Sequence, residues 1–117
     1  NKRQQIPVQN LNYYDILLVT GIANPSLILK ELKKYTPKIK HLKYGDHHSF
    51  TLADIDNIKK EYQKLGEYRI ILTTEKDFVR LKSFDLIREK IYYWPINVEI
   101  DRKEEFDQII ENYVRKN

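Results

Sequence analysis

Residues 15–20 read DILLVT, residues 69–74 read RIILTT and residues 91–94 read IYYW. Each run is short, largely apolar and rich in β-branched or aromatic side chains, which is typical of a buried strand. Residues 39–44 alternate apolar and polar side chains, which predicts a fourth strand nearer the edge of the sheet. We therefore expect a sheet of about four strands.

Helical patterns separate these runs. Asn24 and Pro25 predict a helix that starts there and ends near residue 35. Thr51 followed by Asp54 is a capping-box pattern, and it begins an amphipathic helix that Gly66 closes. Residues 76–82 predict a short helix, residues 84–89 a further turn or two, and residues 97–100 a short extra piece.

The end of the chain predicts a last helix over residues 104–116, with Asp101 as a possible cap. Its expected buried face consists of Phe106, Ile109, Ile110 and Tyr113. Strands and helices thus alternate, which indicates an α/β fold: a three-layer, parallel, Rossmann-like sheet of about four strands with helices on both faces.

A chain of 117 residues and 14.2 kDa has room for one domain. We expect residues 13–117 to form it. Residues 1–12 are mostly polar and contain Pro7, so they are a linker or hinge remnant, or an edge strand. Because the chain begins without Met, we expect a piece of a longer protein.

Composition excludes several classes of function. The chain has no cysteine, so it has no disulfides, thiolate zinc sites or cysteine nucleophile. No apolar run approaches the roughly 20 residues of a membrane span. The net charge of +4 would suit a phosphate-bearing ligand or an anionic membrane, although many small domains with such a charge bind nothing anionic.

Three polar clusters, residues 21–25, 45–49 and 73–77, each follow an expected strand and precede a helix. Because the carboxyl ends of parallel strands share one edge of a sheet, we expect the three clusters to meet on one rim, where ligands of α/β proteins bind. Neither glycine-rich phosphate-binding pattern occurs in the sequence. The chain therefore has no recognisable phosphate cradle.

Each cluster has more than one interpretation. The first could be only turn and cap chemistry, and in the third Thr74 and Asp77 could only cap a helix. His47 beside Asp46 could act as a general base or proton relay, since imidazole titrates near neutrality. The same residues with His48 could bind a metal, or could be ordinary loop residues.

Read together, the clusters resemble one family. Residues 21–25 match the pattern G-I-[GA]-x-P, residues 46–47 match D-H, and residues 74–80 match T-E-K-D-[AF]-V-[KR]. Order and spacing fit the carboxyl-terminal domain of tetraacyldisaccharide 4'-kinases, enzymes of lipid A synthesis, over about residues 14–95. The chain departs from that family at Ile28, where an aromatic is usual, and His48 lies outside the pattern.

The resemblance implies that the full-length enzyme moves the γ-phosphate of ATP to the 4'-hydroxyl of a tetraacyldisaccharide 1-phosphate, giving lipid IV-A. It implies that ATP and Mg²⁺ are bound mainly by an amino-terminal P-loop domain that these 117 residues lack, joined through a two-stranded hinge to which residues 1–12 would contribute. This piece alone would then hold no cofactor or metal and would be inactive. The implied location is the cytoplasmic side of the inner membrane of a Gram-negative bacterium, as a peripheral protein.

The resemblance also implies roles for single residues. His47 would pair with an Asp of the kinase domain and help to activate the sugar hydroxyl, and Asp46 would orient or tune His47. The remaining positions would shape the cleft wall that faces the nucleotide domain: Gly21, Asn24, Pro25, Thr74, Glu75, Lys76 and Asp77.

Three other functions compete with this one. A non-catalytic, flavodoxin-like binding module would not need His47. A phosphoesterase of the Asp-His-His type needs further Asp residues in separate motifs, and no D-x-D pattern follows an expected strand. A nucleic-acid binder would need rings interleaved with Arg on an exposed face, whereas Tyr92, Tyr93 and Trp94 belong to a strand run, so we expect no nucleic-acid partner.

Overall fold

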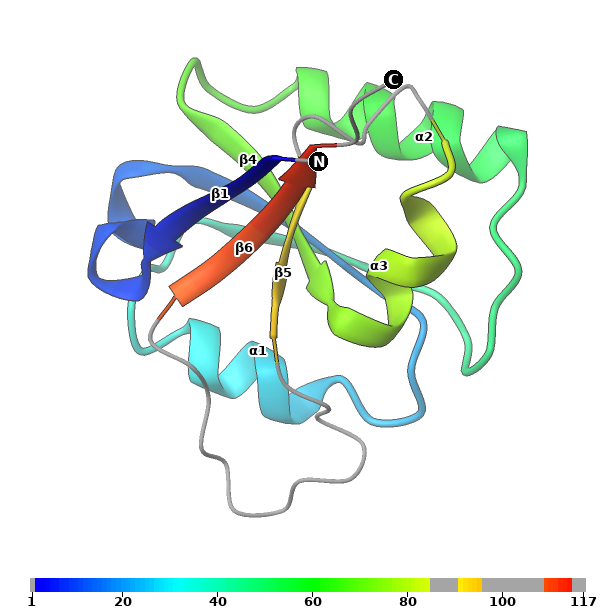
Figure 1. Ribbon diagram of the computed structural model, residues 1–117, viewed down its shortest axis with the longest axis horizontal. Helices are drawn as coiled ribbons and strands as arrows, with labels where there is room; N and C mark the ends of the chain where they lie inside the picture. The colour runs from blue at the N-terminus through cyan, green and yellow to red at the C-terminus, as the bar shows by residue number, and fades with distance from the viewer. Residues whose placement is uncertain (1, 85–90, 96–108, 115–117) are drawn as a thin grey trace.

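The computed structural model describes residues 2–84, 91–95 and 109–114 (Figure 1). Ten elements follow one another along the chain: β1 (Lys2–Pro7), η1 (Val8–Tyr13), β2 (Asp15–Thr20), α1 (Ser26–Leu32), β3 (Ile39–Lys43), α2 (Leu52–Gln63), β4 (Arg69–Thr74), α3 (Glu75–Leu81), β5 (Ile91–Trp94) and β6 (Ile109–Val114).

The strands form one six-stranded sheet in the order β1-β6-β5-β4-β2-β3. The expected parallel part is present, because β2 pairs in parallel with β3 and β4, and β4 with β5. The α/β class is confirmed, but a sheet of only four parallel strands is wrong. β6 pairs antiparallel with both β5 and β1, so the sheet is mixed.

The final helix expected over residues 104–116 is also wrong where the structure describes it. Residues Ile109–Val114 form strand β6, with Ile110 buried opposite Ile6 of β1. The helical spacing of apolar residues was misleading, because pairing with a strand from the opposite end of the chain overrides local periodicity. Asp101, Phe106 and the segments 85–89 and 97–100 lie outside the described residues.

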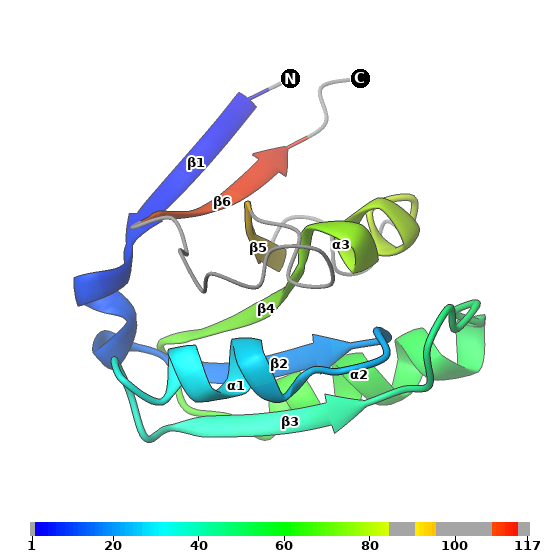
Figure 2. The same cartoon turned by 90° about the horizontal axis from the view of Figure 1, so that it is seen from below.

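β1 contains half of the segment 1–12, which could have been a linker or an edge strand. It is an edge strand, and Pro7 is its last residue. Proline has no backbone N–H to donate to a neighbouring strand, so it is tolerated at such an edge and not in a central strand. β1 and β6 lie together at one end of the sheet (Figure 2). The division of the chain at residue 13 and the hinge role of residues 1–12 stay predictions.

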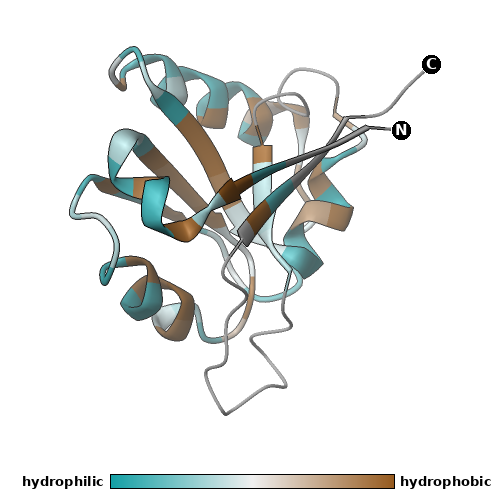
Figure 3. Ribbon diagram, turned by 60° about the vertical axis from the view of Figure 1, so that its left-hand side comes forward, coloured by the Kyte–Doolittle hydropathy of each residue, from teal (hydrophilic) through white to brown (hydrophobic). Residues whose placement is uncertain are grey.

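Two apolar layers hold the helices against the sheet. On one face, Ile28 and Leu32 of α1 pack with Ile16 and Leu18 of β2. On the other face, α2 and α3 pack against Leu17 and its neighbours. Helices therefore cover both faces, as expected, and the apolar residues concentrate on the central strands (Figure 3).

Capping positions the ends of these helices. The expected capping box is present at α2: the Asp54 N–H donates to Thr51 Oγ1 at 3.1 Å, and the Thr51 N–H donates to Asp54 Oδ2 at 3.0 Å. At α1, by contrast, Pro25 and not Asn24 is the N-cap residue, and no side chain caps the helix; Asn24 Oδ1 accepts from the Ser26 N–H at 3.3 Å just before it. No helix among the described residues combines the length and apolarity that a membrane crossing requires.

Candidate functional site

The topology singles out the space between β2 and β4. From β2 the chain crosses to β3 on one side and then returns to β4 on the other, so the connections diverge between these two neighbouring strands. Such switch points are where open α/β sheets bind ligands, outside the carboxyl ends of the strands. Gly21 follows β2 there, and Thr74 ends β4.

In this protein the Asp77 carboxylate fills that space. Asp77 is fully buried, and its Oδ2 accepts hydrogen bonds from the Gly21 N–H at 2.8 Å and the Thr74 hydroxyl at 2.9 Å. Thr74 Oγ1 in turn accepts from the Asp77 N–H at 3.0 Å and caps α3. A Cβ at residue 21 would lie 3.1 Å from Asp77 Oδ1 and 3.4 Å from the Gly45 carbonyl oxygen, so glycine permits this close approach.

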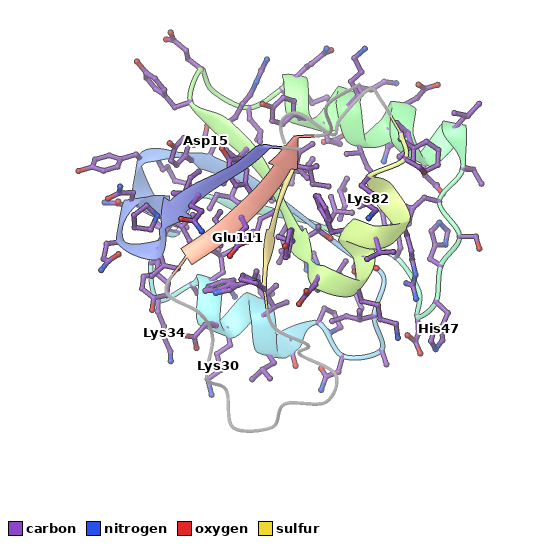
Figure 4. The ribbon with its side chains drawn as sticks, in the orientation of Figure 1. Asp15, Lys30, Lys34, His47, Lys82 and Glu111 are labelled. Atoms are coloured by element: carbon purple, nitrogen blue, oxygen red, sulfur yellow. The ribbon has the colours of Figure 1, made fainter. Side chains whose placement is uncertain are left out.

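The loop between β3 and α2 brings His47 to the same place (Figure 4). Its N–H donates to the Gly21 carbonyl oxygen at 3.1 Å, and its φ of 58° is the only positive φ of a non-glycine residue in the described part of the chain. Its side chain is 68% exposed, with Nε2 3.5 Å from Asp46 Oδ2. A left-handed backbone is uncommon outside glycine, and histidine is among the residues that adopt it more readily, so the turn can hold His47 at this place on the rim.

The structure therefore brings the three sequence clusters together through Gly21, Asp46, His47, Thr74 and Asp77. Of the other residues expected at the cleft, Glu75 and Lys76 directly follow Thr74. Glu75 is exposed and Lys76 half-buried in the first turn of α3.

Asn24 and Pro25 line a different feature. Together with His41 and Lys43 they border a shallow groove of about 220 Å³ between α1 and β3. His41 Nε2 lies 2.8 Å from Thr20 Oγ1, and burial, with a smaller effect of Lys43, lowers the pKa of His41. The first cluster thus contributes to two places, the rim through Gly21 and the groove through Asn24 and Pro25.

Arg80 is a site residue that sequence reasoning missed. Its Nη1 donates to the Gly21 carbonyl oxygen and to Asp77 Oδ1, both at 3.2 Å, and its Nη2 lies 3.3 Å from His47 Nδ1. The spacing of three residues from Asp77 on a helix was a visible signal, but the contacts to residues 21 and 47 required the folded chain.

His48 contacts a different set of residues from His47. Its Nε2–H donates to Asp54 Oδ2 at 2.7 Å, and its ring stacks on Tyr44 with centroids 4.8 Å apart and meets Phe50 edge-on. The two histidines therefore have different partners. Among the described residues, no group of three or more His, Asp or Glu side chains could hold a metal ion.

The His48 contact makes stability depend on pH. The hydrogen bond from His48, followed by that from the Thr51 N–H, holds the pKa of Asp54 below its ordinary value of 3.8. A carboxyl whose pKa is lowered by folding stabilises the protein above its unfolded pKa, and this contribution disappears as the pH falls through the folded value.

We therefore expect Asp54→Asn to lower the stability at neutral pH and to flatten its decline below about pH 4. Urea unfolding across pH 2–7 measures this. Asp56→Asn, an exposed carboxylate on the same helix, is the matched control and should leave the curve unchanged. Parallel acid declines in the Asp54→Asn and unsubstituted proteins would contradict the expectation.

Comparison with known proteins gives a consistent result. The family model described as tetraacyldisaccharide-1-P 4'-kinase matches residues 1–115. The tetraacyldisaccharide 4'-kinase of Bacteroides thetaiotaomicron is 46% identical over 120 residues, which cover 97% of this chain and 32% of that protein. Those of Phocaeicola vulgatus (47% identical, covering 87% of this chain and 30% of that protein) and Flavobacterium johnsoniae (35%, 99% and 32%) are also similar.

The chain spans about a third of the length of these curated relatives. No solved structure matches it significantly. The family match covers nearly every residue, and it includes the three clusters that meet on the rim. This chain belongs to the tetraacyldisaccharide-1-P 4'-kinase family.

Proposed function

We propose that this chain is the carboxyl-terminal domain of a kinase that transfers the γ-phosphate of ATP to the 4'-hydroxyl of a tetraacyldisaccharide 1-phosphate, giving lipid IV-A. The observation that carries the proposal is the placement of His47: an exposed imidazole, on a left-handed backbone bonded to Gly21, at the carboxyl edge of the parallel strands. Its proposed role is to help to activate the sugar hydroxyl, with Asp46 orienting it.

The chemistry fits a domain that supplies only part of an active site. Phosphoryl transfer depends on positioning and charge stabilisation more than on covalent chemistry. A domain that closes over the reactants can add one orienting side chain and exclude water. An imidazole on a rim, fixed through its own backbone, suits such a contribution.

The residues at the switch point do not fit a bound nucleotide. A phosphate at this position would use backbone N–H groups such as that of Gly21, but the Asp77 carboxylate already accepts this hydrogen bond. We propose that ATP and Mg²⁺ are bound by the remainder of the protein, an amino-terminal P-loop domain that this chain meets along its rim.

The partners and location follow from the same proposal. The acceptor is an acylated disaccharide phosphate, and the cleft wall facing the nucleotide domain includes the rim residues with Glu75 and Lys76. Residues 1–12 contribute to the hinge, which suits the position of β1 and β6 at one end of the sheet. The protein works as a peripheral protein on the cytoplasmic side of the inner membrane of a Gram-negative bacterium.

Two assays test this function together. The full-length protein should transfer labelled γ-phosphate from ATP to tetraacyldisaccharide 1-phosphate, and the chain of 117 residues alone should neither hydrolyse ATP nor bind it tightly in calorimetry. Tight ATP binding by the isolated chain would contradict the division of labour. Absence of transfer by the full-length protein would contradict the kinase itself.

A further inference from the structure

Arg80 connects Gly21 of the first cluster and Asp77 of the third to the ring of His47 in the second. It lies in the last turn of α3, and its side chain is 24% exposed. One terminal nitrogen, Nη1, contacts Gly21 and the buried Asp77, while the other, Nη2, lies 3.3 Å from His47 Nδ1. Two anchored contacts thus direct the remaining nitrogen toward the imidazole.

The charge state of arginine determines the role of each ring nitrogen. A guanidinium has only donors and stays protonated in proteins, so His47 Nδ1 must accept its hydrogen bond. A neutral imidazole has a single N–H, which is then on Nε2. That nitrogen lies 3.5 Å from Asp46 Oδ2, and it can donate to a carboxylate.

We propose that Arg80 is a positioning residue for His47, which it holds through Nδ1 so that the Nε2–H edge faces the reacting groups. This inference rests on the proposed function, because it assigns Arg80 a part in that same site. The backbone bond from the His47 N–H to Gly21 fixes the start of the side chain, and Arg80 fixes the ring. With both, a side chain that is largely exposed keeps one orientation.

Arg80 could instead serve only to brace Asp77 and Gly21. The two roles differ in what happens once His47 is absent. A brace matters with or without the imidazole, whereas a positioning residue has nothing left to position. A double-mutant cycle separates them, because it measures whether two substitutions act through each other.

The cycle uses the full-length protein with His47→Ala, Arg80→Gln and the double variant, each checked for folding by thermal unfolding. Arg80→Gln should lower kcat by about 10–100-fold, the size of effect expected from a misplaced group, and should leave the KM for ATP nearly unchanged. In the His47→Ala background the same substitution should change kcat by less than about twofold. Lys82→Gln, which removes an exposed cation beyond the same helix, is the matched control.

An equal loss in both backgrounds would overturn the proposal and leave Arg80 as a brace. If Arg80→Gln does not fold, Arg80→Lys keeps the cation beside Asp77 and takes its place in the cycle. If His47→Ala alone leaves kcat unchanged, the proposed function of His47 fails, and the inference for Arg80 is then decided by a measurement independent of activity.

That measurement is nitrogen NMR of isotope-labelled histidine, with the His47 signal assigned by its loss in His47→Ala. The Nδ1 resonance should show an accepted hydrogen bond in the unsubstituted protein, shift in Arg80→Gln and stay in place in Lys82→Gln. An Nδ1 resonance that does not respond to Arg80→Gln would overturn the contact and the proposal with it.

Discussion

In the full-length protein that contains this chain, His47→Ala lowers the turnover number by about 10²–10⁴-fold, the usual size of general acid–base assistance, which His47 supports by orienting the reacting groups through its Nε2–H. The affinity for ATP should change little, because the proposed nucleotide site lies outside this chain. Steady-state kinetics with varied ATP and acceptor lipid measure both quantities. The expected signature is a fall in kcat with a nearly constant KM for ATP.

Tyr68→Ala is the control for this measurement. Tyr68 is 69% exposed and lies just before β4 starts, at the opposite edge of the sheet from the rim. Its loss should leave the turnover number unchanged. Should His47→Ala also leave it unchanged, the catalytic role is wrong, and a non-catalytic binding module becomes the better description of the chain.

Asp77→Ala has the largest expected effect on stability, a decrease of about 2–4 kcal/mol in the free energy of unfolding. The substitution removes the acceptor of the buried Gly21 N–H and of the Thr74 hydroxyl, and it leaves Arg80 without its carboxylate. Unpaired buried polar groups lose their solvation without compensation, whereas the exposed side of Arg80 limits the electrostatic part. Urea unfolding of the 117-residue chain measures the change.

Glu75→Ala is the matched control, since Glu75 is an exposed carboxylate in the same helical turn. It should decrease the stability by less than about 1 kcal/mol, the value of a charge at a helix end. Asp77→Asn separates the effect of side-chain shape on stability from the effect of charge, because the amide keeps one acceptor oxygen but cannot form the ion pair with Arg80. Equal stabilities of Asp77→Ala and Glu75→Ala would show that the Asp77 network does not hold the rim together.

Both predictions depend on the same feature of the switch point: the Asp77 side chain accepts the hydrogen bond of a backbone N–H that could otherwise bind a ligand. Where many α/β proteins leave backbone N–H groups open to a ligand, this chain uses a side chain of its own. The carboxylate ties the end of β2 to the start of α3, and Arg80 extends the network to the loop of His47. The rim therefore supports one exposed imidazole, and its buried carboxylate and the Gly21 N–H are already paired with each other.

Much of this rim could be predicted from the sequence because the relevant signals are local. The runs at 15–20, 69–74 and 91–94 have the composition of buried strands, and each is a strand. The capping box of Thr51 and Asp54 lies within one helical turn. Parallel strands place their carboxyl ends on one edge, so the meeting of residues 21, 47 and 77 followed from the order of elements alone.

Only the tertiary structure decided the rest, because the interactions concerned join residues far apart in the chain. β6 is a strand since β1, from the other end of the sequence, pairs with it, and no local pattern of residues 104–116 contains that partner. The burial of Asp77, the left-handed backbone of His47 and the contact between His47 and Arg80 exist only after three loops are brought together. The residue types of the site can be identified from the sequence, but the contact that the His47 ring makes with Arg80 depends on the folded chain, because the two residues are 33 positions apart.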